Sequence, residues 1–281
     1  MYTQYITEPR YWLLAIATAL ITLHVGLLTQ IDDSNLLGIS ILCWLTIASL
    51  VWDKLETLEL KSNLVSSLLG ISAIAFVLLR SLSTAGYHLR ICPLISLVGL
   101  CLLASGIQGL RNYWKELLAV SLLIFISVLA ALLKSINLPI FTTQFSTFLL
   151  WSTGFEAIRD GVMILLPTGR VEVYGACSGI ESIVQMFSIA VLFCLIIPLN
   201  KIAQVICLTV AIGLGFVVNA ARVALMAVLV ASSQLEAFEY WHGGDGSLIF
   251  SAISVVLFGT FCWLALLRNS NHATALGVAN D

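Results

Sequence analysis

Eight apolar segments dominate this sequence, and they have about the length needed to cross a bilayer. A spanning helix needs about 17 to 25 mostly apolar residues, since lipid offers the backbone no hydrogen-bonding partners. Hydrophobic residues make up 60% of the chain, charged residues 10%, and the mean hydropathy is +1.04, unlike soluble domains. The pattern predicts an all-α polytopic membrane protein with about eight transmembrane helices, near residues 11–28, 36–52, 64–79, 91–107, 117–133, 180–199, 203–230 and 247–267.

The spacing of these segments predicts a single integral membrane domain over residues 1–281. It comprises five transmembrane helices in 1–133, an extracytoplasmic loop in 134–179, a three-helix part in 180–267 and a cytoplasmic tail in 268–281. No cleavage-site pattern follows the first segment, so we expect a retained helix rather than a signal peptide. A slight excess of basic residues favours placing these flanks in the cytoplasm: Arg10, Lys54, Lys61, Arg111, Lys115, Lys201 and Arg268. The outer loops would hold Arg80, Arg90, Lys134, Arg159 and Arg170.

The loop over 134–179 departs from plain transmembrane sequence. Apolar residues recur at helical spacing over 141–149, with polar residues between them, which predicts a short extracytoplasmic helix lying in the membrane interface. Pro167 and Gly169 fit a tight turn between two apolar runs, which predicts a small β-hairpin. An open hairpin cannot face lipid, so it should lie on the outer surface or pack against the helices.

Basic residues are scattered rather than clustered, so neither nucleic-acid binding nor a polybasic lipid-binding patch is predicted. Six of the seven cysteines lie in or beside apolar segments, where a thiol usually packs as a small hydrophobic group: Cys43, Cys92, Cys101, Cys194, Cys207 and Cys262. Cys177 instead lies in a polar, glycine-containing stretch. No CxxC pair or zinc-type spacing occurs, so neither a structural metal nor a cofactor is predicted.

Cys177 directly precedes the sixth apolar segment and is a candidate nucleophile. The free N–H groups at a helix N-terminus stabilise a thiolate, and a nearby cation lowers the thiol pKa further. Two alternatives remain open, namely that Cys177 is a packing residue or that it pairs with Cys92. Glu181 lies one turn later on the same helical face, where it can orient His242 or pair with Arg222.

Arg222 interrupts an otherwise apolar segment, which predicts that it faces a cavity or a partner. Asn219 lies one turn earlier on the same face. Together they can donate hydrogen bonds to a carbonyl oxygen that becomes negative during acyl transfer. The alternative is that Arg222 reaches the interface and pairs with Glu236 or Glu239.

His242 lies in a glycine-rich loop before the last apolar segment. A histidine can deprotonate a thiol and then protonate a leaving amine. The alternatives are a merely solvated histidine, or that His24 or His88 takes the role. A zinc site built from Cys177, His242 and Asp245 lacks a ligand-spacing signature.

Three short motifs occur in order at the outer ends of successive helices: Ala-Cys177-Ser-Gly-Ile, Asn219-x-x-Arg222 and His242-Gly-Gly-Asp-Gly-Ser. In this order the sequence resembles the exosortase/archaeosortase family, and the glycine-rich stretch is most similar to its cyanobacterial branch, the cyanoexosortases. The resemblance implies that Cys177 is the nucleophile, Arg222 the transition-state stabiliser and His242 the general acid and base.

The resemblance also implies a function: cleavage of secreted proteins at a C-terminal sorting signal, followed by transfer to an acceptor. Such a signal has a short motif such as Pro-Glu-Pro, a transmembrane helix and a basic tail. The expected location is the inner membrane, with the active site on the extracytoplasmic face. Two other classes remain open. One is a transporter with Arg222 and Glu181 lining its path, although no inverted repeat is evident. The other is a non-catalytic component of an export system.

Overall fold

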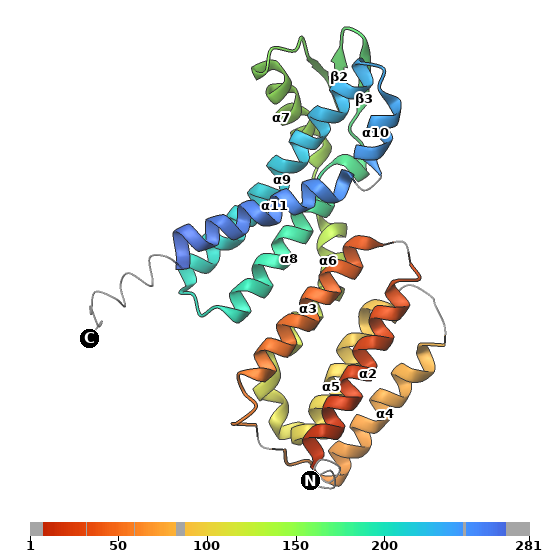
Figure 1. Ribbon diagram of the computed structural model, residues 1–281, viewed down its shortest axis with the longest axis vertical. Coiled ribbons are helices and arrows are strands. Elements are labelled where there is room, and N and C mark those ends of the chain that lie inside the picture. Colours follow the sequence, from red (N-terminus) through yellow and green to blue (C-terminus); the bar gives the residue numbers. More distant parts are fainter. Residues whose placement is uncertain (1–7, 32, 59, 83–87, 244–245, 268–281) are drawn as a thin grey trace, which may run out of the picture. The chain divides into compact units, whose positions relative to one another are not determined.

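A computed structural model describes residues 8–31, 33–58, 60–82, 88–243 and 246–267 (Figure 1). A helix occupies each of the eight predicted segments. By length and hydropathy, five helical stretches can cross a membrane: Pro9–Leu28, Ser34–Trp52, His88–Leu133, Lys201–Ala231 and Gly246–Leu266. The difference from eight has a simple origin, because two predicted segments form helices of 17 residues and two others join into one stretch. The protein is therefore helical and multi-pass.

The chain forms two compact units, residues 1–127 with 191–198 and residues 128–190 with 199–281. Two helices contribute residues to both units, α6 (Trp114–Leu133) and α8 (Ile180–Ile196). The tail predicted over 268–281 lies outside the described residues.

The first unit is an assembly of apolar helices: α2 (Pro9–Leu28), α3 (Ser34–Trp52), α4 (Leu64–Arg80), α5 (His88–Gly109), the 3-10 helix η1 (Leu110–Tyr113) and the first part of α6. Asp33 caps α3 and Asn63 caps α4, each accepting a backbone N–H three residues later. Glycines let α4 and α5 approach closely, since a Cβ atom at Gly70 would lie 2.8 Å from the carbonyl oxygen of Gly99.

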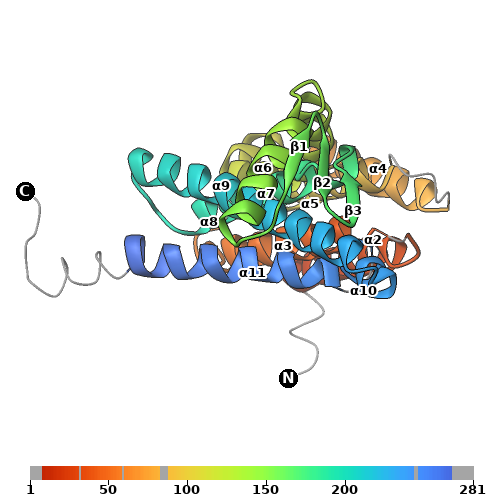
Figure 2. The ribbon, with the colours of Figure 1, turned by 90° about the horizontal axis from the view of Figure 1, so that it is seen from above.

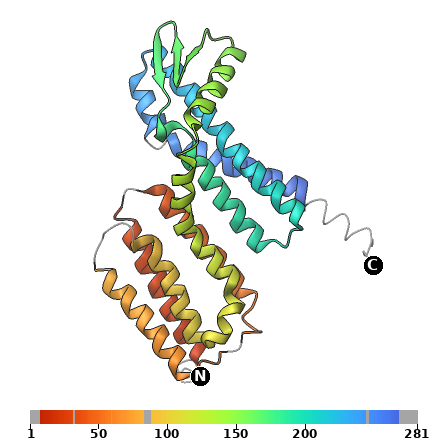
Figure 3. The same ribbon diagram turned by 180° about the vertical axis from the view of Figure 1, so that it is seen from behind.

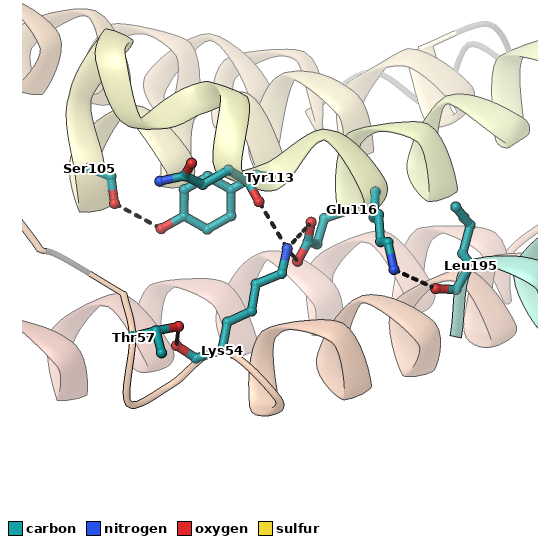
Figure 4. Close-up of polar contacts among 8 residues, drawn as sticks. Lys54, Thr57, Ser105, Tyr113, Glu116 and Leu195 are labelled. Carbon is teal, nitrogen blue, oxygen red and sulfur yellow. Dashed lines mark hydrogen bonds and ion pairs between the residues drawn. The ribbon is translucent and has the colours of Figure 1, made fainter. Parts of the chain in front are cut away.

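An ion pair joins the turn after α3 to α6 in this unit (Figure 4). The Nζ of Lys54 lies 2.7 and 3.1 Å from the two carboxylate oxygens of Glu116 and donates to the carbonyl of Asn112 at 2.8 Å. Glu116 is 0% exposed. A carboxylate in such surroundings requires a partner, because an isolated buried charge is strongly destabilising.

The second unit contains helix α7 (Leu138–Ser152), strands β1 (Ile158–Asp160), β2 (Met163–Leu166) and β3 (Gly169–Glu172), and the 3-10 helix η2 (Gly175–Cys177). Most of α8 follows, with α9 (Lys201–Ala231), α10 (Leu235–His242), α11 (Gly246–Phe261) and the π-helix η3 (Cys262–Leu267). Helices α9 and α11 run side by side in Figures 1 and 3. Ile164, Val173 and Cys177 pack against α9 in the core of this unit.

The predicted hairpin is confirmed, but it is part of a larger sheet. Strands β2 and β3 pair antiparallel with Leu166 opposite Gly169, so Pro167 and Thr168 form the turn. Strand β1 adds to the other edge of β2 and gives a three-stranded sheet in the order β1-β2-β3 (Figure 2). We did not predict β1, because its three exposed residues are too short to show an alternating pattern.

Helix α7 is confirmed, but its polar side faces the interior rather than water. Thr142, Thr143 and Ser146 are 0% exposed, whereas Phe141 and Phe148 are more than half exposed. Ser146 donates to the carbonyl of Ala220 on α9 at 2.8 Å. An outward apolar side suits lipid, where hydroxyl groups are stable only when they bond within the protein.

Candidate active site

Cys177 lies in a tight loop between β3 and α8. Its N–H donates to the carbonyl of Tyr174 at 2.9 Å, which closes the single turn of η2. Gly179 then leads into α8 with a φ of +87°, a conformation that glycine adopts without steric penalty. A Cβ atom at Gly179 would lie 2.8 Å from the side-chain nitrogen of Asn219. The approach of the loop to α9 therefore requires glycine at this position.

Two buried side chains hold this loop from neighbouring helices. Asn219 Nδ2 on α9 donates to the carbonyl of Cys177 at 3.0 Å, and Thr142 Oγ1 on α7 donates to the carbonyl of Ser178 at 2.7 Å. Both side chains are buried, so these hydrogen bonds face little competition from water. They fix the backbone of Cys177. One donor of Asn219 is therefore committed to the Cys177 carbonyl.

The Cys177 thiol faces the ring of His242. The Sγ–Nε2 distance is 3.4 Å, and Cys177 is 5% exposed. Burial is the main influence on the Cys177 thiol and raises its pKa. The charge of Arg222 and a hydrogen bond with Tyr174 lower the pKa, whereas the charge of Glu181 raises it. Our expectation of a lowered pKa is therefore wrong. Removing the thiol from water disfavours its ionisation more than the neighbouring groups favour it.

His242 is the last residue of α10 rather than part of a loop. Its ring stacks on Phe238 one turn earlier, with a centroid separation of 5.1 Å and an interplanar angle of 13°. The hydroxyl of Tyr174 lies 3.1 Å from Nε2, and the edge of the Tyr174 ring also packs against the imidazole. These contacts hold Nε2 toward Cys177.

Arg222 reaches from α9 to the carboxyl end of α10. Its Nε donates to the carbonyl of Trp241 at 3.1 Å, and its Nη2 donates to the carbonyl of His242. Carbonyls at the end of a helix have no partner within the helix, so the guanidinium acts as a C-terminal cap. Arginine has five N–H donors, and these two bonds leave others available for a substrate oxygen.

The remaining acidic candidates make no such contacts. Glu181 is exposed on α8 and has no hydrogen bond or ion pair within the described part of the chain. Glu236 and Glu239 are exposed, and neither pairs with Arg222 among the described residues. Asp245, the third residue of the zinc alternative, lies outside the described ranges. Within those ranges, no three histidine, cysteine or acidic side chains are grouped as metal ligands would be.

The rival histidines have partners of their own in the first unit. His24 accepts a hydrogen bond from Trp44 Nε1 at 3.0 Å, and its Nε2 lies 3.0 Å from the carbonyl of Leu89. His88 contacts the guanidinium of Arg80. Neither ring forms a hydrogen bond with a cysteine among the described residues, although both line one small pocket with Cys92. Cys92 and Cys177 are both free thiols and are not joined to each other.

Sequence reasoning missed Tyr174 and Phe238, the two aromatic side chains that hold His242. Tyr174 ends the strand-like run before the cysteine loop, where an aromatic residue is unremarkable as a strand former. Phe238 lies four residues before His242, so recognition of helix α10 would have placed both on one face. The helix was recognisable, because 235–242 begins with the good helix formers Leu-Glu-Ala and is followed by Gly243.

The chain also matches a known family. The sequence model of transmembrane exosortases (Exosortase_EpsH) matches residues 31–259, which include Cys177, Arg222 and His242. Neither a curated protein nor a solved structure gives a significant match. The family match covers most of the chain and extends over both compact units. This chain therefore belongs to the transmembrane exosortase family.

Proposed function

We propose that this protein is a membrane-embedded cysteine transpeptidase that cleaves a C-terminal sorting signal and transfers the new carboxyl end of its client to an acceptor. One observation carries the proposal: the Cys177 sulfur lies 3.4 Å from Nε2 of His242 while Arg222 binds the carbonyl of that same histidine. Membership of the exosortase family supports the reaction class, since exosortases are in general membrane cysteine transpeptidases.

The reaction begins with transfer of the Cys177 thiol proton to Nε2 of His242. The thiolate attacks the scissile carbonyl carbon, and the C–N bond then breaks as Nε2 returns the proton to the leaving amine. A thioester remains on Cys177. An acceptor amine, or water, next gives a proton to Nε2 and attacks the thioester carbonyl. The C–S bond breaks, and the thiolate recovers its proton from His242.

Arg222 serves this chemistry in two ways. The N–H groups that it does not use on α10 stabilise the oxyanion of each tetrahedral intermediate, as preorganised hydrogen-bond donors do in other acyl-transfer sites. The two that it does use hold His242 in place. Asn219 supports the same site by fixing the backbone of Cys177, and the charge of Glu181 acts on Cys177 and Arg222 through space.

The membrane arrangement belongs to the proposal as well. We place eight crossings along the chain, with α5 and α6 counted separately and the shorter α4 and α8 included, which brings Cys177 to the extracytoplasmic face of the inner membrane. The client is a secreted protein with a motif such as Pro-Glu-Pro, a transmembrane helix and a basic tail. A client helix that docks from the bilayer would present its motif at the depth of the thiol, which makes the attack effectively intramolecular. We assign the chain to the cyanobacterial branch.

A substitution pair tests the proposal. Cys177→Ala should give an inserted protein that leaves a sorting-signal client uncleaved, as judged by the intact mass of the client after co-expression. Cys92→Ala is the matched control, because Cys92 is also a free thiol but belongs to the first unit. It should process the client at the wild-type rate. Client maturation by the Cys177→Ala protein would rule out the assigned nucleophile.

A further inference from the structure

Tyr174 is the one hydroxyl-bearing side chain described in contact with His242, and the proposed reaction leaves it without a role. Its Oη lies 3.1 Å from Nε2 of His242. The same hydroxyl acts on Cys177, where a hydrogen bond with Tyr174 lowers the pKa of the thiol against the larger effect of burial. Cys177 Sγ lies 3.4 Å from the same nitrogen, so sulfur, phenol oxygen and Nε2 form a triangle in which Nε2 contacts both other atoms.

The protonation states of this triangle differ in energy because of the hydroxyl. In the neutral state the thiol and the imidazole carry no charge, so every hydrogen bond that the hydroxyl makes is an ordinary one. In the ionised state Nε2–H of the imidazolium donates to Oη, and the Oη–H donates to the thiolate. Hydrogen bonds to ionised groups are about twice as strong as neutral ones. The hydroxyl therefore favours the thiolate–imidazolium pair.

The surroundings of Tyr174 allow it to act as this donor. Partial burial and the neighbouring Cys177 raise the pKa of Tyr174, so its hydroxyl keeps a proton near neutral pH. The side chain is 49% exposed, which leaves the triangle open to an arriving substrate. On the far side of the imidazole, Phe238 offers only a stacked ring. His242 Nδ1 has no hydrogen-bond partner among the described residues, so no carboxylate or amide orients the ring there.

We propose that Tyr174 is a further catalytic residue, whose hydroxyl stabilises the thiolate–imidazolium form of Cys177 and His242. The role rests on the proposed function, since it prepares the same thiol for attack. Tyr174 thus supplies what a carboxylate or amide supplies in other nucleophile–histidine pairs, but it acts at Nε2 and sulfur rather than at Nδ1.

Alkylation of Cys177 tests this role without any client. Full-length protein in detergent is treated with iodoacetamide from pH 6 to pH 10, and modification of the Cys177 peptide is followed by mass spectrometry. The rate follows the thiolate fraction. Tyr174→Phe keeps the ring but removes the donor, so we expect roughly ten- to a hundredfold slower alkylation near neutral pH. The profile should move to higher pH, and the difference from the wild-type rate should shrink as the pH approaches 10.

A second variant changes the strength of the donor without removing it. Site-specific 2-fluorotyrosine at position 174 makes the hydroxyl a slightly stronger donor that still keeps its proton near neutral pH, so in this range the Cys177 profile should move to lower pH. Tyr240→Phe is the matched control, because this exposed tyrosine on α10 has no described hydroxyl contact, and its profile should equal the wild type. A Tyr174→Phe profile that coincides with the wild type would overturn the role, as would faster alkylation at every pH. The role would also be overturned if the alkylation profiles of Tyr174→Phe and of the fluorotyrosine variant moved in the same direction along the pH axis. Because no client takes part, failure of client cleavage by the wild type would refute the proposed function separately.

Discussion

The cap that Arg222 places on α10 predicts how far removal of its side chain should slow the reaction. Arg222→Met keeps an apolar side chain of similar length and deletes both donors to the carbonyls of Trp241 and His242. A hydrogen bond to a charged group contributes about 1.5 to 3 kcal/mol, and the lower value applies because Arg222 is only half-buried. Two such bonds amount to about 3 kcal/mol, or roughly a 150-fold smaller population of correctly placed His242.

The assay is the initial rate of client cleavage in membranes containing equal amounts of inserted enzyme. Arg222→Met should be slower by about two orders of magnitude or more, since the oxyanion also loses its donors. Arg222→Lys should fall between this variant and the wild type, because an ammonium keeps the charge but not the planar fork that binds two carbonyls. If Arg222→Met cleaves within threefold of the wild-type rate, the cap does not position His242 and the reasoning fails.

Three further predictions concern stability and ionisation. Gly179→Ala should destabilise the protein by at least about 1 to 2 kcal/mol in denaturant unfolding, because of its positive φ and the close approach of α9, whereas Gly213→Ala should not. Lys54→Met should cost about 3 kcal/mol by leaving Glu116 buried without a partner, and the double variant Lys54→Met/Glu116→Leu should recover most of it. Since burial raises the pKa of the Cys177 thiol, its alkylation rate should climb at a higher pH than that of an unperturbed cysteine; a midpoint below the ordinary value would contradict the described burial.

The parts of the fold that the sequence predicts well are those with a strong, long-range signal. Apolar segments locate all eight principal helices to within a few residues, since lipid imposes a fixed length on each. The hairpin at Pro167 and Gly169 follows from turn chemistry. Strand β1 carries one usable signal that we did not use: Gly161 and Val162 form the two-residue turn between β1 and β2, and Gly161 at its first position has a φ of +59°, as hairpin turns favour.

The candidate site also has features that the sequence predicts and features that it does not. Cys177, Arg222 and His242 stand out because each is a reactive or charged group in an apolar or glycine-rich setting, and the structure brings them together. Their detailed environment is not visible in a linear pattern. Whether burial or neighbouring charge dominates the thiol pKa depends on packing, and so does the contact between Tyr174 and His242. The Tyr174–His242 contact joins residues 68 positions apart, and the charge acting on the thiol comes from Arg222 on another helix.

The central claim is that Cys177 carries the client as a thioester, and trapping that intermediate tests it most directly. Wild-type enzyme is mixed with a synthetic client segment that contains the sorting motif, quenched in acid, digested and sequenced by tandem mass spectrometry. The account predicts an acyl adduct on the Cys177 peptide that disappears with hydroxylamine and is absent from Cys177→Ala. Client cleavage accompanied by an adduct on another residue, or cleavage that persists in Cys177→Ala, would contradict it.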